Sequence, residues 1–245
     1  MTRRAAMVTG ASRGIGAEIA RMLAADGHDL TISARGRDAL DALAAELTAS
    51  HGVRVEVVGA DMSSETDVRN IAAVHRAAHG RLDTLVLNAG MGAIGPLADY
   101  PVRRLDKMFA INVRSAYVLI QELLPLLETA GTQRPEGGRV LAIASMTGVA
   151  GEPLNSAYGA TKAALISLCE TLNTEHSLDG VTATAICPGY VATAMTEGLA
   201  DSVPPETMLP VADVAAATVA LTRLSRRTVV PRLVLTRPGP HLWRA

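Results

Sequence analysis

The sequence predicts an α/β fold: one doubly wound parallel sheet of about seven strands with helices on both faces. Short apolar runs alternate with longer stretches of helical period along the whole chain. The short runs are nearly continuous Val, Leu, Ile and Ala, which is typical of parallel strands that helices cover on both faces. The chain has 245 residues, of which 49% are hydrophobic, and no linker-like stretch. Residues 1–245 are therefore expected to form one domain around one core.

The apolar runs and helical stretches define the expected elements in chain order. The expected strands are Ala5–Thr9, Asp29–Ala34, Arg54–Val58, Thr84–Asn88, Arg139–Ala144, Thr182–Cys187 and Thr228–Val234. The expected helices are Ile15–Asp26, Arg37–Ser50, Glu65–His79, Val102–Thr129, Ala157–His176 and Val211–Leu224. Strands that alternate with helices imply right-handed crossovers between parallel strands. Pro231 cannot donate to a sheet ladder, so the last strand is expected at an edge or with a bulge.

Two segments depart from this alternation. Residues 193–210 contain three prolines and break the helical period, and we expect this insertion to form a lid or wall of the substrate pocket. The tail from Thr236 to Ala245, which holds the only tryptophan, Trp243, is expected to be irregular. We expect the tail to pack on the surface or on a neighbouring subunit.

Composition excludes several classes of function. Lys and Arg total 23 against 24 for Asp and Glu, and only six residues are aromatic, so nucleic acid is not an expected partner. No apolar run approaches the ~20 residues of a membrane span, and the Met-Thr-Arg-Arg start leaves no room for a signal peptide. Two distant cysteines, Cys169 and Cys187, suggest a reducing compartment, so a cytoplasmic location is expected. No metal site is expected.

A glycine-rich loop, Thr9-Gly-Ala-Ser-Arg-Gly-Ile-Gly16, joins the first strand to the first helix. Its glycines permit a sharp turn and let a pyrophosphate approach the helix N-terminus, where free N–H groups and the helix dipole favour an anion. The loop lacks the Gly-Lys-Ser/Thr of a P-loop. A turn that only packs helix on strand is the alternative, but the position in the fold favours dinucleotide binding. The expected contacts are Gly10, Ser12, Arg13, Gly14, Ile15 and Gly16.

The end of the second strand indicates which dinucleotide is preferred. NAD-binding proteins place Asp or Glu there to hold the ribose 2′-hydroxyl, whereas this strand ends Ser33-Ala34-Arg35. Arg35, together with Arg13, could pair the oxygens of a 2′-phosphate. Either arginine alone could be an ordinary surface residue. Both together, with the acid absent, favour NADP(H) over NAD(H).

Ser145, Tyr158 and Lys162 form a second group of candidate residues. Tyr158 and Lys162 are four residues apart on one face of the expected helix, and Ser145 follows the fifth strand thirteen residues before Tyr158. An ammonium at ~5 Å should stabilise a phenolate by about 3 kcal/mol, which lowers the phenol pKa by roughly 2 units. Such a phenol could exchange a proton with an alcohol or ketone oxygen that Ser145 holds by a hydrogen bond. YxxxK alone is common on helices, so the prediction depends on the combination.

These motifs together resemble the short-chain dehydrogenase/reductase family, in its compact branch of about 250 residues. The resemblance runs from Thr9 to about Thr196 and implies a Rossmann-like fold, a nicotinamide cofactor and a catalytic tetrad of Asn112, Ser145, Tyr158 and Lys162. Its further cofactor contacts would be Asp61, Met62, Asn88, Ala89, Gly90, Tyr158, Lys162, Pro188, Gly189, Val191 and Thr193.

The resemblance also implies a mechanism. Lys162 would bind the nicotinamide ribose and lower the pKa of Tyr158, which would give or take the proton while hydride moves between nicotinamide and the substrate carbon. Asn112 and Lys162 would relay protons to bulk water. We therefore expect an NADP(H)-dependent oxidoreductase that reduces a ketone, such as a 3-oxoacyl thioester or a similar apolar ketone. The alternatives are an NAD-linked alcohol dehydrogenase and a non-catalytic NADPH-binding redox regulator.

The substrate and the assembly are less closely defined. Apolar side chains are expected to line the substrate pocket: Met91, Met146, Val149, Leu154, Tyr190, Met195 and Met208. In the family, the helices that contain Asn112 and Tyr158 pair with a second subunit, which implies a homodimer or homotetramer. The C-terminal tail departs from the family pattern of a Gly-Gly segment after an Asp, which weakens the case for a tetramer.

Overall fold

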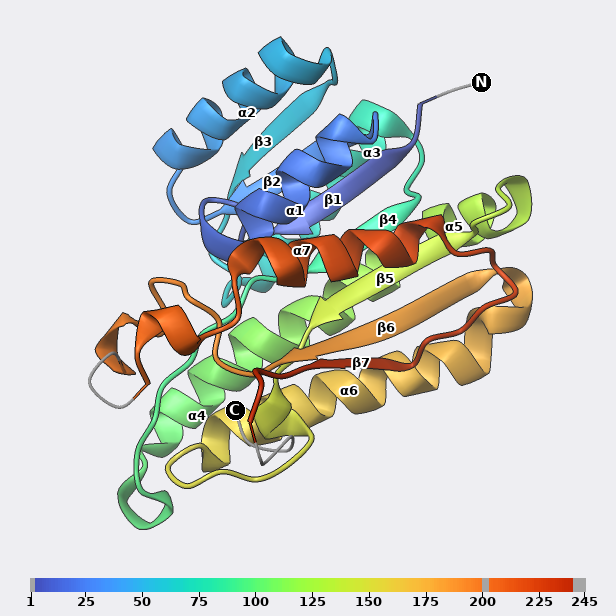
Figure 1. Ribbon diagram of the computed structural model, residues 1–245. Helices are drawn as coiled ribbons and strands as arrows, with labels where there is room; N and C mark the ends of the chain where they lie inside the picture. The colour runs from blue at the N-terminus through green and yellow to red at the C-terminus, as the bar shows by residue number, and fades with distance from the viewer. Residues whose placement is uncertain (1–2, 200–202, 240–245) are drawn as a thin grey trace.

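The protein is described by a computed structural model, in which residues 3–199 and 203–239 are placed. Seven parallel strands form one sheet in the order β3-β2-β1-β4-β5-β6-β7 (Figure 1). The strands are β1 Ala5–Thr9, β2 Asp29–Ala34, β3 Val55–Gly59, β4 Thr84–Leu87, β5 Gly138–Ile143, β6 Val181–Pro188 and β7 Arg232–Leu235. The doubly wound parallel sheet that the sequence predicts is confirmed.

Helices cover both faces of the sheet and bury one apolar cluster on each. The helices are α1 Gly14–Ala25, α2 Asp38–His51, α3 Glu65–His79, α4 Val102–Phe109, α5 Ser115–Gln133, α6 Ser156–His176 and α7 Val211–Ala220. Helices α3, α5 and α6 pack on one face through residues such as Ile71, Leu119 and Leu165. Helices α1, α2 and α7 pack on the other through residues such as Ile19 and Leu43. No helix in the placed part of the chain combines the length and apolarity needed to cross a bilayer.

The observed elements differ from the predicted ones in two informative places. Residues 102–129 were expected to form one helix, but a π-helical turn, Ala110–Arg114, separates α4 from α5. The last strand begins at Arg232 and not at Thr228, because Pro231 has no N–H to donate to the ladder, although its carbonyl accepts from the Ala185 N–H at 3.1 Å. Strand β7 lies at the sheet edge, as predicted. The other predicted strands and helices agree with the structure to within two residues, apart from a 3₁₀ turn, Leu221–Arg223, that follows α7.

The strand order reverses between β1 and β4, which lie side by side in the sheet. At such a switch point, the loops at the carboxyl ends of the two strands diverge and leave a crevice for ligands. The glycine loop follows β1, and Asn88-Ala89-Gly90 follows β4. The fold therefore brings these two segments to the same edge of the sheet.

The insertion at residues 193–210 is tied together at its two ends. Val191 pairs with Leu209 in a short parallel bridge, the Ala192 N–H donates to the Leu209 carbonyl at 3.0 Å, and the Leu209 N–H donates to the Tyr190 carbonyl at 2.9 Å. Its described parts contain only short 3₁₀ turns, Glu197–Leu199 and Pro205–Thr207. The tail is irregular from Thr236 to Gly239, as predicted, and Trp243 lies outside the described residues.

Candidate active site

Tyr158 and Lys162 lie one turn apart near the start of α6. Lys162 is only 3% exposed, whereas Tyr158 is partly buried. The Lys162 Nζ atom lies 5.5 Å from the centre of the Tyr158 ring and donates a hydrogen bond to the Ile143 carbonyl at 2.7 Å. Because Ile143 ends β5, the amine is fixed at the carboxyl end of this strand.

Ser145 lies two residues beyond β5, where extended backbone gives way to a 3₁₀ turn, Met146–Gly148. Its hydroxyl accepts hydrogen bonds from the Thr147 N–H at 3.2 Å and from the Thr147 Oγ1 hydroxyl at 3.0 Å. It also lies near the Tyr158 phenol, whose pKa it lowers by hydrogen bonding. The serine and phenol groups predicted to act together are therefore neighbours.

Two glycines allow the Ser145 turn to dock closely against α6. A Cβ atom on Gly148 would lie 2.7 Å from the Lys162 carbonyl carbon and 2.8 Å from the Ala163 nitrogen. A Cβ atom on Gly159 would lie 2.8 Å from the Thr147 carbonyl oxygen. Side chains at either position would push the turn away from the helix. These glycines, which the sequence analysis did not single out, therefore set the distance between Ser145 and Tyr158.

Asn112 lies in the π-helical turn and is 2% exposed. Its Oδ1 accepts from the Met91 N–H at 2.8 Å, and its Nδ2 donates to the Met91 carbonyl at 2.9 Å and to Thr161 Oγ1 at 3.0 Å. Thr161 in turn donates to the Tyr158 carbonyl at 2.8 Å. The amide thus connects the loop after β4 to the first turns of α6.

Gly90 marks the point at which these groups meet. An added Cβ there would lie 3.5 Å from Lys162 Nζ and 3.6 Å from Asn112 Oδ1. Segments that are far apart in the sequence therefore bring all four residues of the predicted tetrad, Asn112, Ser145, Tyr158 and Lys162, to the carboxyl edge of the sheet.

The pKa of Tyr158 differs from the value expected from the sequence, which was a pKa lowered by the Lys162 ammonium. Burial raises this pKa to about 12, and the hydrogen bond from Ser145 lowers it only in part. Burial also lowers the pKa of Lys162 to about 8. The expected lowering of the phenol pKa by roughly 2 units is therefore wrong for the protein alone, because loss of hydration outweighs the hydrogen bond from Ser145. The phenol is protonated at neutral pH.

The glycine loop has the features that a bound pyrophosphate requires. Gly10 and Gly14 adopt positive φ angles of 67° and 58°. No side chain in the described part of the chain caps the N-terminus of α1, and its first turn contains no acidic residue, so its N–H groups are left for an anion. A Cβ on Gly14 would lie 3.5 Å from Thr193 Cγ2, so this predicted contact residue faces the loop. The residues present therefore fit a dinucleotide.

Asn88 holds the glycine loop in place. Its Nδ2 donates to the carbonyls of Thr9 at 2.9 Å and Gly10 at 3.0 Å. The N–H groups of Asn88 and Ala89 both donate to Thr9 Oγ1 at 3.0 Å. A Cβ atom on Gly16 would lie 2.4 Å from Asn88 Nδ2, so Gly16 is needed for this packing. Asn88 and Gly16 therefore shape the loop, whatever they contact in a bound cofactor.

Arg13 and Arg35 are exposed on the cofactor side of the sheet. Across residues 3–199 and 203–239, neither guanidinium has an ion-pair partner. Asp61 accepts hydrogen bonds at 2.8 Å from both the N–H and the hydroxyl of Ser63, which lower its pKa, and the charges of Lys107 and Arg35 lower it further. Arg35 thus lies close to Asp61, a predicted cofactor contact. The structure records no contact between Arg13 and Arg35.

The remaining predicted cofactor residues lie around the same crevice. Pro188 ends β6, the Gly189 N–H donates to the Leu235 carbonyl at 2.9 Å, and Val191 is buried in the bridge to Leu209. Ser12 and Ile15 are partly buried in the glycine loop, whereas Met62 is buried beneath the Asp61 turn.

Two of the predicted pocket residues prove to be core residues. Met146 has no exposed surface and Met208 is 6% exposed, so neither is free to contact a substrate. Met195 is 58% exposed and lies beside Gly92, which also faces the Tyr158 ring. Leu154 is 51% exposed. Met195 and Leu154 therefore remain candidates for the pocket wall.

Arg237 is a candidate that the sequence analysis missed. Its guanidinium carbon lies 5.9 Å from the centre of the Tyr190 ring, and its Nη1 donates to Thr207 Oγ1 at 3.5 Å. The tail thus places a positive charge against the insertion, next to a predicted pocket residue. Because the arginine follows the last strand in an irregular segment, no periodicity in the sequence indicated this position.

Comparison with known proteins agrees with this geometry. Residues 4–203 match the family model described as short chain dehydrogenase. The chain belongs to the short-chain dehydrogenase family. Its members share the parallel sheet described above, and this protein is accordingly an oxidoreductase of that family.

Two similar proteins illustrate the range of substrates. D-beta-hydroxybutyrate dehydrogenase from Cupriavidus necator is 36% identical over 195 residues, which cover 79% of this chain and 73% of that protein. A putative ketoacyl reductase of monensin polyketide synthase from Streptomyces virginiae is 35% identical over 198 residues, covering 80% and 74%.

Similar solved structures contain NADP-type cofactors. An alcohol dehydrogenase from the archaeon Thermococcus sibiricus, complexed with 5-hydroxy-NADP, superposes with a TM-score of 0.86 at 30% identity, covering 96% of this chain and 99% of that one. A short chain dehydrogenase from Burkholderia cenocepacia in complex with NADP gives a TM-score of 0.84 at 31% identity, with 96% of each chain covered.

Proposed function

We propose that this dehydrogenase uses NADP(H) and reduces a ketone to a secondary alcohol, with Tyr158 as the proton donor. The observation that supports this most strongly is the position of Lys162 Nζ 5.5 Å from the centre of the Tyr158 ring, with Ser145 near the phenol, at the carboxyl edge of the sheet. The glycine loop would hold the pyrophosphate, and Lys162 and Thr193 would hold the nicotinamide half. The bound dinucleotide would supply the hydride.

The protonation states of Tyr158 and Lys162 favour reduction of a carbonyl group over oxidation of an alcohol. A phenol with a pKa of about 12 is protonated at neutral pH and so can donate a proton to a carbonyl oxygen. As that proton leaves, the Lys162 ammonium, whose pKa is about 8, would stabilise the forming phenolate. Ser145 would hold the same carbonyl oxygen by a hydrogen bond. Lys162 and Asn112 would then return a proton from bulk water to Tyr158.

The preference for NADP(H) depends on Arg35 and Arg13. The second strand ends without an acid, and the guanidinium of Arg35, which has no ion-pair partner among the described residues, is available to a 2′-phosphate. Solved structures of similar proteins hold NADP or NADPH, which supports this choice.

Exchanging the charge at position 35 tests this preference. Since a hydrogen bond to a charged group contributes about 1.5–3 kcal/mol, Arg35→Asp should raise the KM for NADPH by roughly 10- to 150-fold and leave that for NADH unchanged or lower. Arg37→Asp is the matched control, because Arg37 is also exposed but pairs with Asp41 at 3.5 Å. An unchanged KM for NADPH in Arg35→Asp would refute the assignment.

The substrate class is proposed as an apolar ketone, with a 3-oxoacyl thioester or a short 3-oxo acid as the leading candidates. The exposed Met195 and Leu154 offer apolar contacts, and Arg237 offers a positive charge beside Tyr190. Relatives named as a hydroxybutyrate dehydrogenase and a putative ketoacyl reductase support both candidates.

A panel of carbonyl compounds assayed with both cofactors tests the function. Loss of the 340 nm absorbance of NADPH with at least one ketone is expected, and a 3-oxo acid should be reduced faster than its neutral ester if Arg237 binds the carboxylate. Turnover only with NAD⁺ and alcohols would favour an NAD-linked alcohol dehydrogenase. Tight NADPH binding without turnover of any compound would favour a redox regulator.

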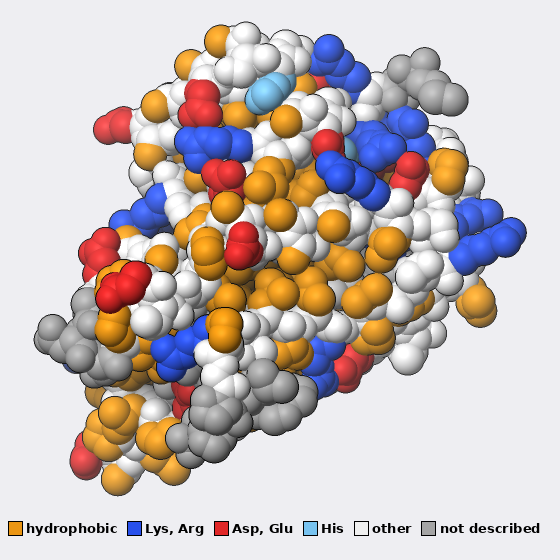
Figure 2. Space-filling model, viewed as in Figure 1, with side chains coloured by type: hydrophobic (Ala, Val, Ile, Leu, Met, Phe, Trp, Pro, Cys, Tyr) orange, Lys and Arg blue, Asp and Glu red, His pale blue; other side chains and the backbone are white. Residues whose placement is uncertain are grey.

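We also propose that the protein is cytoplasmic and forms a homodimer or homotetramer. Phe109, Val113 and Tyr117 line a surface groove of about 360 Å³ on α4, the π turn and α5, and Tyr117 is 52% exposed. Figure 2 shows a second area of hydrophobic side chains on the face that contains α7, β6 and β7. Sedimentation that shows only a 25.5 kDa species would refute the assembly.

A further inference from the structure

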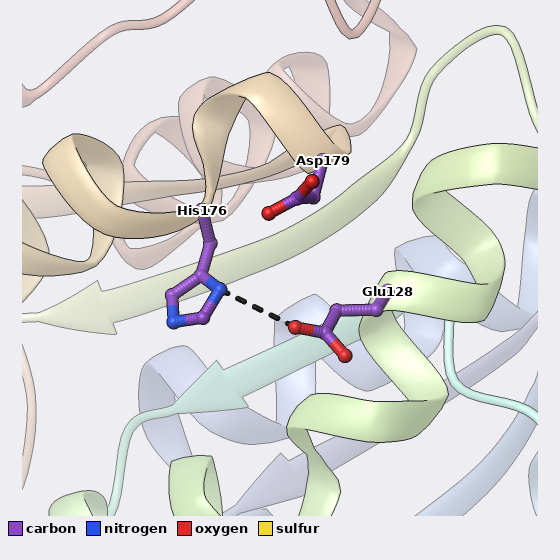
Figure 3. Close-up of side chains that lie close together, drawn as sticks. All are labelled: Glu128, His176 and Asp179. Atoms are coloured by element: carbon purple, nitrogen blue, oxygen red, sulfur yellow. Dashed lines mark ion pairs between the residues drawn. The ribbon is translucent and has the colours of Figure 1, made fainter.

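Helices α5 and α6 both end at the amino edge of the sheet, away from the catalytic tetrad. Glu128 lies in the last turns of α5, His176 ends α6, and Asp179 lies in the 3₁₀ turn that leads into β6. Figure 3 shows the imidazole and the two carboxylates converging on one point between these elements. One ligand atom of each residue lies within 4.8 Å of the other two.

The imidazole of His176 has no internal hydrogen bond at the nitrogen that faces this point. Its Nδ1 atom is buried and lacks a hydrogen-bond partner within the described chain, although Glu128 Oε1 lies 3.3 Å away. On the other side of the ring, Nε2 lies 3.9 Å from Glu175 Oε2. At this separation the Glu175 carboxylate is a nearby negative charge and not a hydrogen-bond partner of the ring.

The backbone that supports the three residues is closely packed. A Cβ on Gly131 would lie 2.3 Å from the Asp179 carbonyl oxygen, and a Cβ on Gly180 would lie 2.5 Å from the Gly131 carbonyl oxygen. The end of α5 and the turn after α6 are therefore in direct backbone contact. This contact fixes the helix ends, whereas the half-exposed carboxylate of Glu128 and the exposed carboxylate of Asp179 can adjust to an ion.

We propose that Glu128, His176 and Asp179 bind a divalent transition-metal ion of the zinc class. One imidazole nitrogen with two carboxylate oxygens is a ligand set that suits Zn²⁺ better than Mg²⁺ or Ca²⁺, which prefer oxygen ligands alone. Tetrahedral coordination at ~2.1 Å separates ligand atoms by about 3.4 Å. Glu128 Oε1 already lies 3.3 Å from His176 Nδ1, so the Asp179 carboxylate is the group that needs to move inward, by roughly 1 Å. The ion would join α5 to α6 and have no part in hydride transfer.

The sequence did not indicate this site. The ligands come from two helices and a turn, and Glu128 and His176 are 48 positions apart. No short motif with metal-ligand spacing connects them.

Calorimetric titration of untagged, EDTA-stripped protein with Zn²⁺ tests the proposal. We expect saturable binding of one ion per chain, no comparable binding of Mg²⁺, and a higher Tm in the presence of Zn²⁺. His176→Ala should weaken binding at least tenfold and abolish the rise in Tm. His51→Ala is the matched control, because His51 is an exposed histidine that also ends a helix, and it should leave both readouts unchanged.

A second variant keeps the test independent of folding defects. Asp179 is exposed, so Asp179→Ala should fold normally and should also weaken Zn²⁺ binding several-fold. Absence of saturable binding, equal binding by wild type and Asp179→Ala, or equal loss in His51→Ala would each overturn the proposal.

Discussion

The two ends of the sheet both bury charged groups, but they use them differently. At the amino end, Asp83 is 4% exposed and accepts hydrogen bonds from the Ala5 N–H at 2.8 Å and from Arg81 Nε at 2.8 Å. Arg139 is also 4% exposed and donates to the carbonyls of Leu224 at 2.6 Å and Ser225 at 2.8 Å. Asp83 is paired with a guanidinium, whereas Arg139 is held by carbonyl groups and its Nε has no partner among the described residues, and each side chain fastens one segment of chain to another.

At the carboxyl end, the buried groups have fewer partners. The Lys162 ammonium donates to one carbonyl, that of Ile143, and the phenol of Tyr158 contacts Ser145 and keeps an exposed edge. Burial of charge alone therefore does not distinguish an active site from a structural ion pair. The distinguishing feature is a buried charge with incomplete internal pairing next to an opening that a ligand can enter. Substitutions at the amino end of the sheet should therefore change stability, and substitutions at the carboxyl end should change turnover.

Removing the phenol oxygen should have the largest effect. Tyr158→Phe deletes the proposed proton donor, so kcat should fall by roughly 10³-fold or more while NADPH binding changes little. Stopped-flow or steady-state kinetics measure kcat, and a fluorescence titration measures NADPH binding. Tyr100→Phe is the control, because the Tyr100 hydroxyl is buried without a partner in the described residues. Turnover above one tenth of wild type in Tyr158→Phe would contradict the assignment.

Separating Ser145 from Tyr158 should have the next largest effect. In Gly148→Ala, the added Cβ would approach the Lys162 backbone within 2.7 Å, so the turn must shift away from α6. We expect kcat to fall by about 100-fold, equivalent to about 2.7 kcal/mol in the barrier. Gly151→Ala is the matched control, since nothing lies within 4 Å of a Cβ there. Equal activity of the two variants would show that the close docking does not position Ser145.

At the amino end, His75 should affect stability and leave turnover unchanged. Burial lowers its pKa to about 4, and its ring nitrogens bond to Thr31 Oγ1 at 2.8 Å and to the Arg81 carbonyl at 2.9 Å. Because the unfolded chain binds the proton more tightly, this residue's contribution is complete above pH 6.5 and is lost as the pH falls toward 4. About 2 kcal/mol of unfolding free energy should disappear between pH 6.5 and pH 5.

The His75 effect is isolated by comparing variants. Urea unfolding of His75→Gln should show a weaker loss of stability between pH 6.5 and pH 5 than wild type shows, whereas His51→Gln should behave as wild type does. A His75→Gln curve parallel to that of wild type would mean that His75 is not held neutral in the folded protein. If His75→Gln also lowered kcat, the amino end of the sheet would affect turnover as well as stability, and the proposed difference between the two ends would be wrong.

Local patterns in the sequence were sufficient to predict the sheet. Near-continuous apolar runs could only be buried strands, so β1 and β2 were predicted to the residue. The Tyr158–Lys162 pair and the strand-end Ser145 were predicted to meet because helix period and sheet polarity are local rules.

Features that depend on tertiary contacts could not be predicted. The π turn around Asn112 is invisible to a helical period, because Asn112 is held by Met91 and Thr161, which come from other elements. The raised pKa of Tyr158 follows from burial, which spacing does not report. The apolar character of Met146 did not show whether it lines the pocket or the core.

The pH dependence of kcat for carbonyl reduction tests most directly whether a protonated phenol, assisted by the Lys162 ammonium, drives turnover. We expect a constant kcat from pH 6 to about 8 and a decline above it, because Lys162, with its pKa of about 8, loses its charge while Tyr158 remains protonated. A kcat that instead rises steadily from pH 6 to pH 10 would make the deprotonated phenol the active form and would contradict the proposed role of Tyr158.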